Sequence, residues 1–137
     1  MWATKIRHKQ CAFNLYAAAM FAHSLPSLAR AFGEADRAER FERIGKDLVK
    51  ATQAKFWSSD LGLFVNNLPR REEEQEVRLC DRSLATAVLF DQCPGGKSEP
   101  ALKVLAEAPP HMGLSYPANA GWRLWALGKG GAVETSS

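Results

Sequence analysis

The sequence is poor in the residues that bind metals or form covalent cross-links. It contains only three cysteines and three histidines. The cysteine count is odd, no two cysteines form a CxxC pair, and no histidine stands at metal-ligand spacing from them. The sequence therefore predicts no disulfide framework, no metal site and no cofactor. The cysteines are expected to be small buried side chains: Cys11, Cys80 and Cys93.

Long apolar runs and a strong charge of one sign are missing as well. No run approaches the ~18 apolar residues of a membrane-spanning helix. The basic start, Met1–Gln10, lacks the apolar core and cleavage site of a signal peptide. The formal net charge is only +3, and acidic and basic residues are interspersed. These features predict a globular chain that neither spans a membrane nor binds nucleic acid.

Motifs for nucleotide binding, zinc proteases and serine hydrolases are absent, and no repeat recurs with a constant period. The sequence does contain apolar residues at helical spacing. A first helix is predicted over Lys9–Ser24. Pro26 has no N–H to donate to residue 22, so it predicts a kink or break before a short continuation over Ser27–Phe32. Gly33 then suits the left-handed position that ends a helix.

The second predicted helix is the longest, and it runs from Glu34 or Ala35 to about Trp57. Only a short link around Gly33 separates it from the first helix, which predicts an antiparallel hairpin. The segment Ser58–Leu68 is interpreted as a turn with a short extended piece. The apolar stripe of the first helix is expected at Cys11, Leu15, Ala18, Ala19 and Ala22, and that of the second at Ala38, Phe41, Ile44, Leu48 and Ala51.

Three shorter helices are predicted in the rest of the chain. They cover Asp81–Gln92, Glu99–Ala108 with Ser98 as its cap, and Pro117–Gly128. The fold class is therefore all-α, with two to three helical hairpins joined by irregular loops. One helical unit over residues 10–131 is flanked by a basic segment at 1–9 and a tail at 132–137.

Two runs in the second half of the chain carry a family resemblance. They are Asp81–Pro94, DRSLATAVLFDQCP, and Met112–Leu127, MGLSYPANAGWRLWAL. Both resemble helix-and-loop segments of bacterial α-L-rhamnosidases of glycoside hydrolase family 78. The second helix with its LGLFVNN turn is similar to a helical hairpin of the same family. The resemblance covers residues 10–131 and implies a partial (α/α)6 toroid, with two to three of the six hairpins in this chain.

The resemblance also implies a reaction and a substrate. Members of the family hydrolyse terminal α-linked L-rhamnose with inversion. One glutamic acid protonates the leaving oxygen, and one glutamate activates water. Neither of the family's two glutamate motifs occurs here, and AVETSS replaces the expected continuation after Gly131. The resemblance thus implies a fragment with no catalytic residue, inactive alone. Its partners in the complete enzyme are a rhamnose-containing glycan and the remaining barrel segments.

Six residues are candidates for contact with sugar: Asp81, Arg82, Tyr116, Asn119, Trp122 and Trp125. Aromatic rings stack on the faces of pyranoses, and polar groups bind hydroxyls. Trp122 and Trp125 are three residues apart, on one side of a helix whose N-terminal end holds Tyr116 and Asn119. The alternatives are that both tryptophans pack between hairpins, and that Asp81 and Arg82 form a helix cap and a surface ion pair.

Two other functions fit the same pattern. One is a free-standing helical interaction module that uses the bare faces of its end helices. The other is another toroid enzyme, such as an acylglucosamine epimerase-like isomerase, although the patternless histidines count against it. A toroid fragment should leave the first and last helices without one neighbour each. The side chains expected to be exposed are Leu15, Ala18 and Ala22 in the first helix and Trp122, Leu124, Trp125 and Leu127 in the last.

Overall fold

The fold is known from a computed structural model, which describes residues 10–65, 79–110, 112–114 and 120–131. Helices hold 73% of the described residues. The expected all-α class is therefore confirmed, with four two-residue strands added among the described residues. The predicted flanking segments, 1–9 and 132–137, lie outside the part of the chain that the structure describes.

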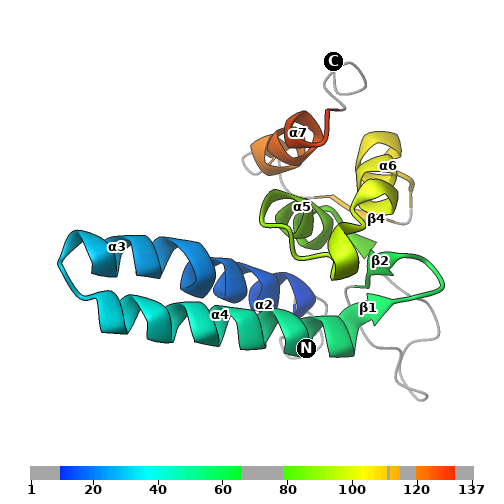
Figure 1. Cartoon of the computed structure of the whole chain (residues 1–137). Helices are drawn as coiled ribbons and strands as arrows, with labels where there is room; N and C mark the ends of the chain where they lie inside the picture. Colours follow the sequence, from blue (N-terminus) through cyan, green and yellow to red (C-terminus); the bar gives the residue numbers. More distant parts are fainter. Residues whose placement is uncertain (1–9, 66–78, 111, 115–119, 132–137) are drawn as a thin grey trace, which may run out of the picture.

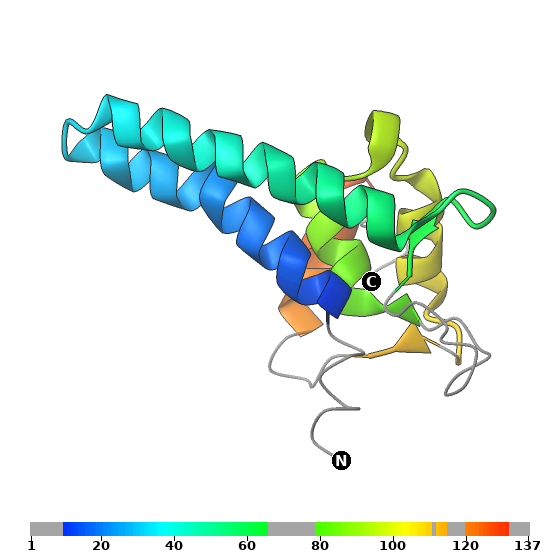
Figure 2. The same ribbon diagram turned by 90° about the horizontal axis from the view of Figure 1, so that it is seen from below.

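The first helical rod is continuous, so the kink or break predicted at Pro26 takes the form of a kink. It consists of α2 (Gln10–Ala19), the π-helical segment η1 (Met20–Ser24) and α3 (Leu25–Ala31). The N–H of Leu25 donates to the carbonyl of Met20, five residues back, so the hydrogen-bond ladder changes register just before the proline. Figure 2 shows that the rod changes direction there, so the expected kink is present. Gly33, with φ of 74°, ends the rod as predicted.

The second long helix, α4 (Ala35–Phe56), lies antiparallel to this rod, as the hairpin prediction required. The predicted stripe on α4 is partly wrong, because Ile44 and Ala51 are exposed while Gly45 and Thr52 are buried. The helices approach so closely that a Cβ on Gly45 would lie 2.7 Å from the backbone nitrogen of Ala22. The hydroxyl of Thr52 donates to the carbonyl of Leu48 at 2.7 Å. Gly45 is therefore buried because it has no side chain, and Thr52 because its hydroxyl has a hydrogen-bond partner.

A small β-hairpin follows α4, where the sequence predicts a turn with an extended piece. It pairs β1 (Trp57–Ser58) with β2 (Leu63–Phe64) in antiparallel register. Phe64 is almost fully buried and packs edge-to-face on Trp57, with 5.1 Å between ring centroids. The second pair, β3 (Leu79–Cys80) with β4 (Met112–Gly113), is parallel and was not predicted. Two-residue strands that meet across more than thirty positions leave no period in the sequence.

The remaining helices are α5 (Asp81–Leu89), the short 3₁₀ turn η2 (Pro94–Gly96), α6 (Glu99–Glu107) and α7 (Ala120–Lys129). The predicted third helix runs three residues too far, because the chain leaves the helix at Phe90 and Asp91 has φ of 52°. Ser98 occupies the expected N-cap position of α6 but makes no side-chain cap hydrogen bond. The predicted position of the cap is therefore confirmed, without the side-chain hydrogen bond.

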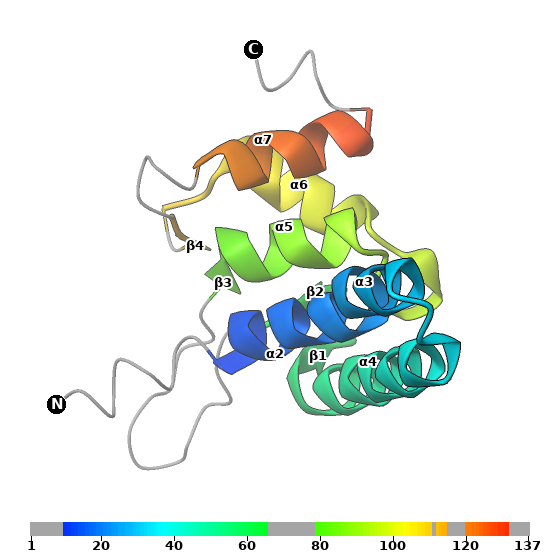
Figure 3. The same cartoon turned by 90° about the vertical axis from the view of Figure 1, so that its left-hand side faces the viewer.

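Helix α5 lies at the centre of the molecule, between α2 on one side and α7 on the other (Figure 3). The loop after α5 is tied to both long helices. The side-chain amide of Gln92 donates to the backbone carbonyl of Leu15 at 2.9 Å, and the backbone carbonyl of Gln92 accepts from the side chain of Gln53 at 2.8 Å. In Figure 1, helices α5, α6 and α7 stack over one half of the long hairpin, and α3 with the start of α4 projects beyond them.

The expected bare faces at the two ends are only partly present. Leu15 and Ala18 are fully buried, because α4 and α5 cover α2 from two sides, and Ala22 is half-buried. At the other end Leu124 and Trp125 are exposed as expected, but Leu127 is buried in the core. The chain therefore buries or half-buries most of the apolar side chains expected to be exposed at its two ends. Leu124 and Trp125 remain exposed.

The C-terminal end of α5 is capped by a lysine from α7. The ammonium of Lys129 donates to the carbonyls of Val88 at 3.2 Å and Leu89 at 2.8 Å and pairs with Asp91 at 3.1 Å. A cation at this end of a helix satisfies free carbonyls and opposes the helix dipole. The Lys129 side chain is partly exposed, so solvent weakens the effect.

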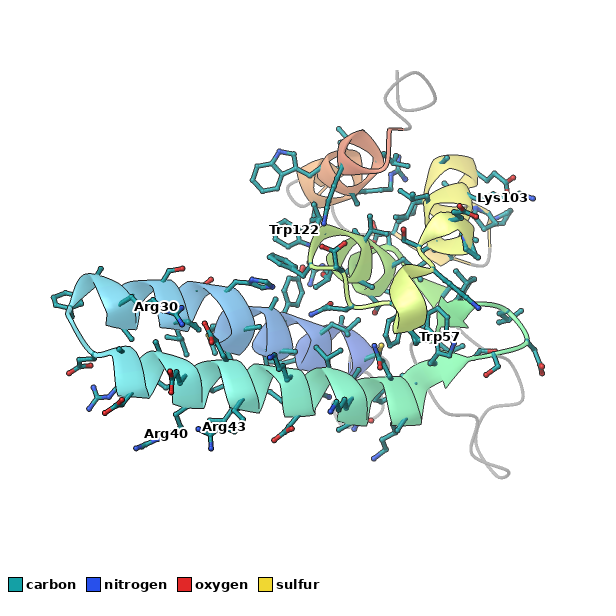
Figure 4. The ribbon with its side chains drawn as sticks, viewed as in Figure 1. Arg30, Arg40, Arg43, Trp57, Lys103 and Trp122 are labelled. Atoms are coloured by element: carbon teal, nitrogen blue, oxygen red, sulfur yellow. The ribbon has the colours of Figure 1, made fainter. Side chains whose placement is uncertain are left out.

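Replacing Lys129 with methionine should therefore lower the free energy of unfolding by ~1 kcal/mol. Urea titration followed by circular dichroism measures this change. The matched control is Lys103→Met, because Lys103 is exposed on α6 and points away from the other helices (Figure 4). Equal effects of the two substitutions would show that the cap does not stabilise the fold.

Candidate functional site

A cluster of aromatic rings joins α7 to α2 and to the end of α5. Trp122 is its centre, and the ring centroids of Tyr16, Phe90 and Trp125 lie 5.8, 6.0 and 5.9 Å from it. All three pairs are tilted, a favourable arrangement for aromatic rings. These four residues are called the aromatic cluster below. His23 extends it from η1, since its ring stacks on Phe90 at 5.5 Å.

Trp122 is fixed in place by a hydrogen bond as well as by packing. Its indole N–H donates to the hydroxyl oxygen of Thr86 at 2.9 Å, and Thr86 is fully buried in α5. Figure 4 shows Trp122 reaching from α7 toward α5. The ring of Trp122 therefore has a fixed orientation, set by contacts with α5 and α2, and it is half-exposed to solvent.

Trp125 has a different environment, although it is one turn further along α7. It is 68% exposed, the most of any tryptophan in the described residues. The alternative in which both tryptophans pack between hairpins is therefore wrong for Trp125. Trp122 packs between helices, whereas Trp125 offers an open ring to solvent.

Asp81 and Arg82 lie at the start of α5, as expected, but they differ in burial. Asp81 is buried and Arg82 is half-buried. Asp81 is 4% exposed, so the surface position considered for it is wrong. The N-cap position is Cys80, which makes no side-chain cap bond. Arg82 is half-buried, one turn before Thr86 on the same face of α5. That face also carries Phe90, so Arg82 lies along the row that meets Trp122.

The other two candidates, Tyr116 and Asn119, lie outside the described residues. Three residues of the site were missed as sugar-contacting candidates: Tyr16, Thr86 and Phe90. Thr86 and Phe90 belong to the run Asp81–Pro94, at positions i+4 and i+8 from Arg82, and this spacing is a usable signal. Tyr16 comes from a helix more than a hundred residues from Trp122, and no local pattern marks it.

Two of the three cysteines are unsuited to act as nucleophiles. Cys11 and Cys93 are buried, as expected, and Cys80 is only partly so. Burial raises the pKa of the Cys11 thiol to about 12 and that of Cys93 to about 11. Both thiols are therefore protonated at neutral pH and unreactive. Among the described residues, no three His, Cys, Asp or Glu side chains are grouped to hold a metal ion.

The aromatic cluster combines apolar ring faces with polar groups. Flat apolar rings with a phenol and an indole at their edges suit a ligand with both an apolar face and hydroxyl groups.

Within the ranges that the structure describes, no helix is long and apolar enough to cross a bilayer. Comparisons of the chain with models of protein families, with curated proteins and with solved structures found no match.

Proposed function

We propose that this chain is a helical segment of an inverting glycosidase that removes terminal α-L-rhamnose, with an (α/α)6 toroid as its complete fold. In this proposal α2–α3 and α4 form one hairpin, and α5, α6 and α7 contribute the next elements of the ring. The aromatic cluster faces the sugar, and the catalytic glutamates come from segments outside this chain.

One observation carries the proposal. The two runs that resemble the family, Asp81–Pro94 and Met112–Leu127, are distant in sequence but meet in space. Thr86 and Phe90 of the first run both contact Trp122 of the second, by the 2.9 Å hydrogen bond and the 6.0 Å ring contact. A resemblance that gathers at one place in the fold supports a shared site better than scattered matches do.

Sugar contact in this proposal is divided between the tryptophans. Trp125 stacks its open ring on the apolar face of a pyranose, because that ring is the more exposed of the pair. Trp122 positions the platform, because Thr86 holds its indole. Arg82, on the Thr86 face of α5, is suited to donate to sugar hydroxyls.

The chain alone should not hydrolyse p-nitrophenyl α-L-rhamnoside. Each missing proton-transfer group removes roughly 10²–10⁴-fold in rate. The assay compares the purified chain with Trp125→Ala and with a buffer blank. Release of nitrophenol that depends on the purified chain, whether or not Trp125→Ala reduces it, would overturn the assignment of this chain as a non-catalytic segment.

Retention on immobilised L-rhamnose tests the binding half of the proposal. The chain should be retarded on that column relative to a blocked column, and Trp125→Ala should abolish the delay. Leu61→Ala is the matched control, because Leu61 is an exposed apolar residue on the β1–β2 turn. Equal retention of the chain on both columns would contradict sugar binding.

A free-standing interaction module is the second candidate. It is favoured by the complete burial of Leu15 and Ala18 within the chain. If the first helix packed against a hairpin outside this chain, these two side chains would be exposed in the isolated chain. One continuous apolar core also joins α2, α5, α6 and α7. Cooperative unfolding of the chain at high temperature, without sugar binding, would favour this candidate.

A further inference from the structure

Exposed apolar side chains are concentrated on two elements of the described structure. Five of the ten large hydrophobic residues that are exposed lie on the first helical rod and its end: Phe13, Tyr16, Met20, Leu28 and Phe32. Two more, Leu124 and Trp125, lie on α7. The five residues on the rod are called the ridge below. Isolated exposed apolar residues are ordinary, but seven of ten on two neighbouring elements form a patch.

The π segment keeps the ridge on one side of the rod. Phe13, Tyr16 and Met20 are spaced three and four apart, so they share one face of α2. In an uninterrupted α-helix, Leu28 would be rotated by about 80° from Met20, because eight residues turn about 100° each. The π turn, with its hydrogen bond from Leu25 to Met20, contains one extra residue. It brings Leu28 and Phe32 back toward the face of Met20.

The ridge and α7 border the same open corner of the molecule. Tyr16 of the ridge contacts Trp122 of α7, which places the two elements side by side at one end. Beyond that contact, α3 projects past α5 and α7 (Figure 1), and Leu28 and Phe32 are exposed there. The corner therefore has one apolar wall on the rod and a second on α7.

Charge on these two walls is sparse and mostly neutralised. Neither Gln10–Phe32 nor Ala120–Lys129 contains an aspartate or a glutamate. Arg30 pairs with Glu42 of α4 at 2.6 Å, and Lys129 pairs with Asp91. Arg123 adds one further positive charge. Depletion of charge at the centre of a surface is typical of interfaces between identical subunits.

We propose that this corner joins two copies of the chain, with the ridge of each copy packed on α7 of the other. Such an arrangement is isologous, so a single two-fold axis covers both walls of both copies. A fully exposed large side chain contributes about 200 Å², and the seven residues are exposed by between 37% and 76%. The patch is then on the order of 800 Å², the area that a stable interface buries on each partner.

This inference does not rest on sugar binding, although the dimer would cover the same Trp125 ring. Its test is the mass of the full chain in solution. Sedimentation velocity should give twice 15.1 kDa at high concentration, with dissociation at roughly micromolar concentration. Leu28→Glu should give a monomer over the same range, because the ridge would then bury an unpaired carboxylate. Leu28 is exposed in the free chain, so the variant should retain the helical circular dichroism of the parent.

The matched control is Leu61→Glu, which alters another exposed leucine, on the β1–β2 turn and away from both walls. It should leave the dimer intact. A chain that stays monomeric at ~200 µM, about a hundredfold above the expected dissociation constant, would overturn the proposal and leave the corner to a different polypeptide. Equal disruption by Leu28→Glu and Leu61→Glu, or a continuous distribution of larger species, would also overturn it.

Discussion

Replacing Gly45 with alanine should destabilise the protein by about 1–3 kcal/mol, and valine at the same position should cost more. The new Cβ would lie 2.7 Å from the nitrogen of Ala22, 2.8 Å from its Cβ and 2.9 Å from its Cα. The nitrogen and Cα belong to the backbone of η1, so they cannot rotate away. Relief requires α4 to move off the π segment, which opens the interface that carries Phe21 against Phe41.

Urea denaturation followed by circular dichroism measures the effect, and Gly121→Ala is the matched control. Gly121 is also helical, in α7, and nothing lies within 4 Å of a Cβ built on it. There alanine should raise the stability by roughly 0.5–1 kcal/mol through its better helix propensity. If the two glycine variants shift the midpoint in the same direction, the close approach of α4 to η1 does not exist in solution.

Replacing Trp122 with alanine should destabilise the fold by about 2–3 kcal/mol, less than for a fully buried aromatic residue because Trp122 is half-exposed. The substitution removes three ring contacts and leaves the buried hydroxyl of Thr86 without its indole donor. Trp122→Phe should keep most of the ring packing and lose the hydrogen bond alone, at a cost of ~1 kcal/mol.

Trp125→Ala provides the comparison, because the same type of side chain is removed one turn away. Trp125 is mostly exposed, so its loss should change stability by less than about 0.5 kcal/mol. Thermal unfolding at low protein concentration, where the chain is monomeric, separates the two effects. Comparable destabilisation by the two alanine variants would contradict the assignment of Trp122 as a positioning residue and Trp125 as an open ring.

The helices themselves could be predicted well from the sequence, because their signals are local. Gly33 ends the first rod and Phe56 precedes the β-hairpin, within a residue or two of the expected bounds. The interhelical surface of α4 could not be predicted in the same way. A search for apolar stripes selects Ile44 and passes over Gly45, yet close packing of two backbones requires the residue without a side chain.

The candidate site could be predicted only in part, for a similar reason. Sequence spacing places Trp122 and Trp125 on one side of α7, and it cannot say which of them is covered. That difference depends on Tyr16 and Phe90, which approach Trp122 from two other elements. The buried state of Asp81 likewise follows from how α5 sits between α2 and α7, not from its position at a helix start.

The most direct test of the proposed function is a titration of the ¹⁵N-labelled Leu28→Glu chain with methyl α-L-rhamnoside, read from the indole N–H signals. Using the variant that is expected to be monomeric separates this result from self-association. The signals of Trp122 and Trp125 should shift and saturate at roughly millimolar sugar. Trp57, which packs on Phe64 in the β-hairpin, should stay unchanged. Absence of any shift, or equal shifts at Trp57 and Trp125, would contradict a sugar-binding surface at the aromatic cluster.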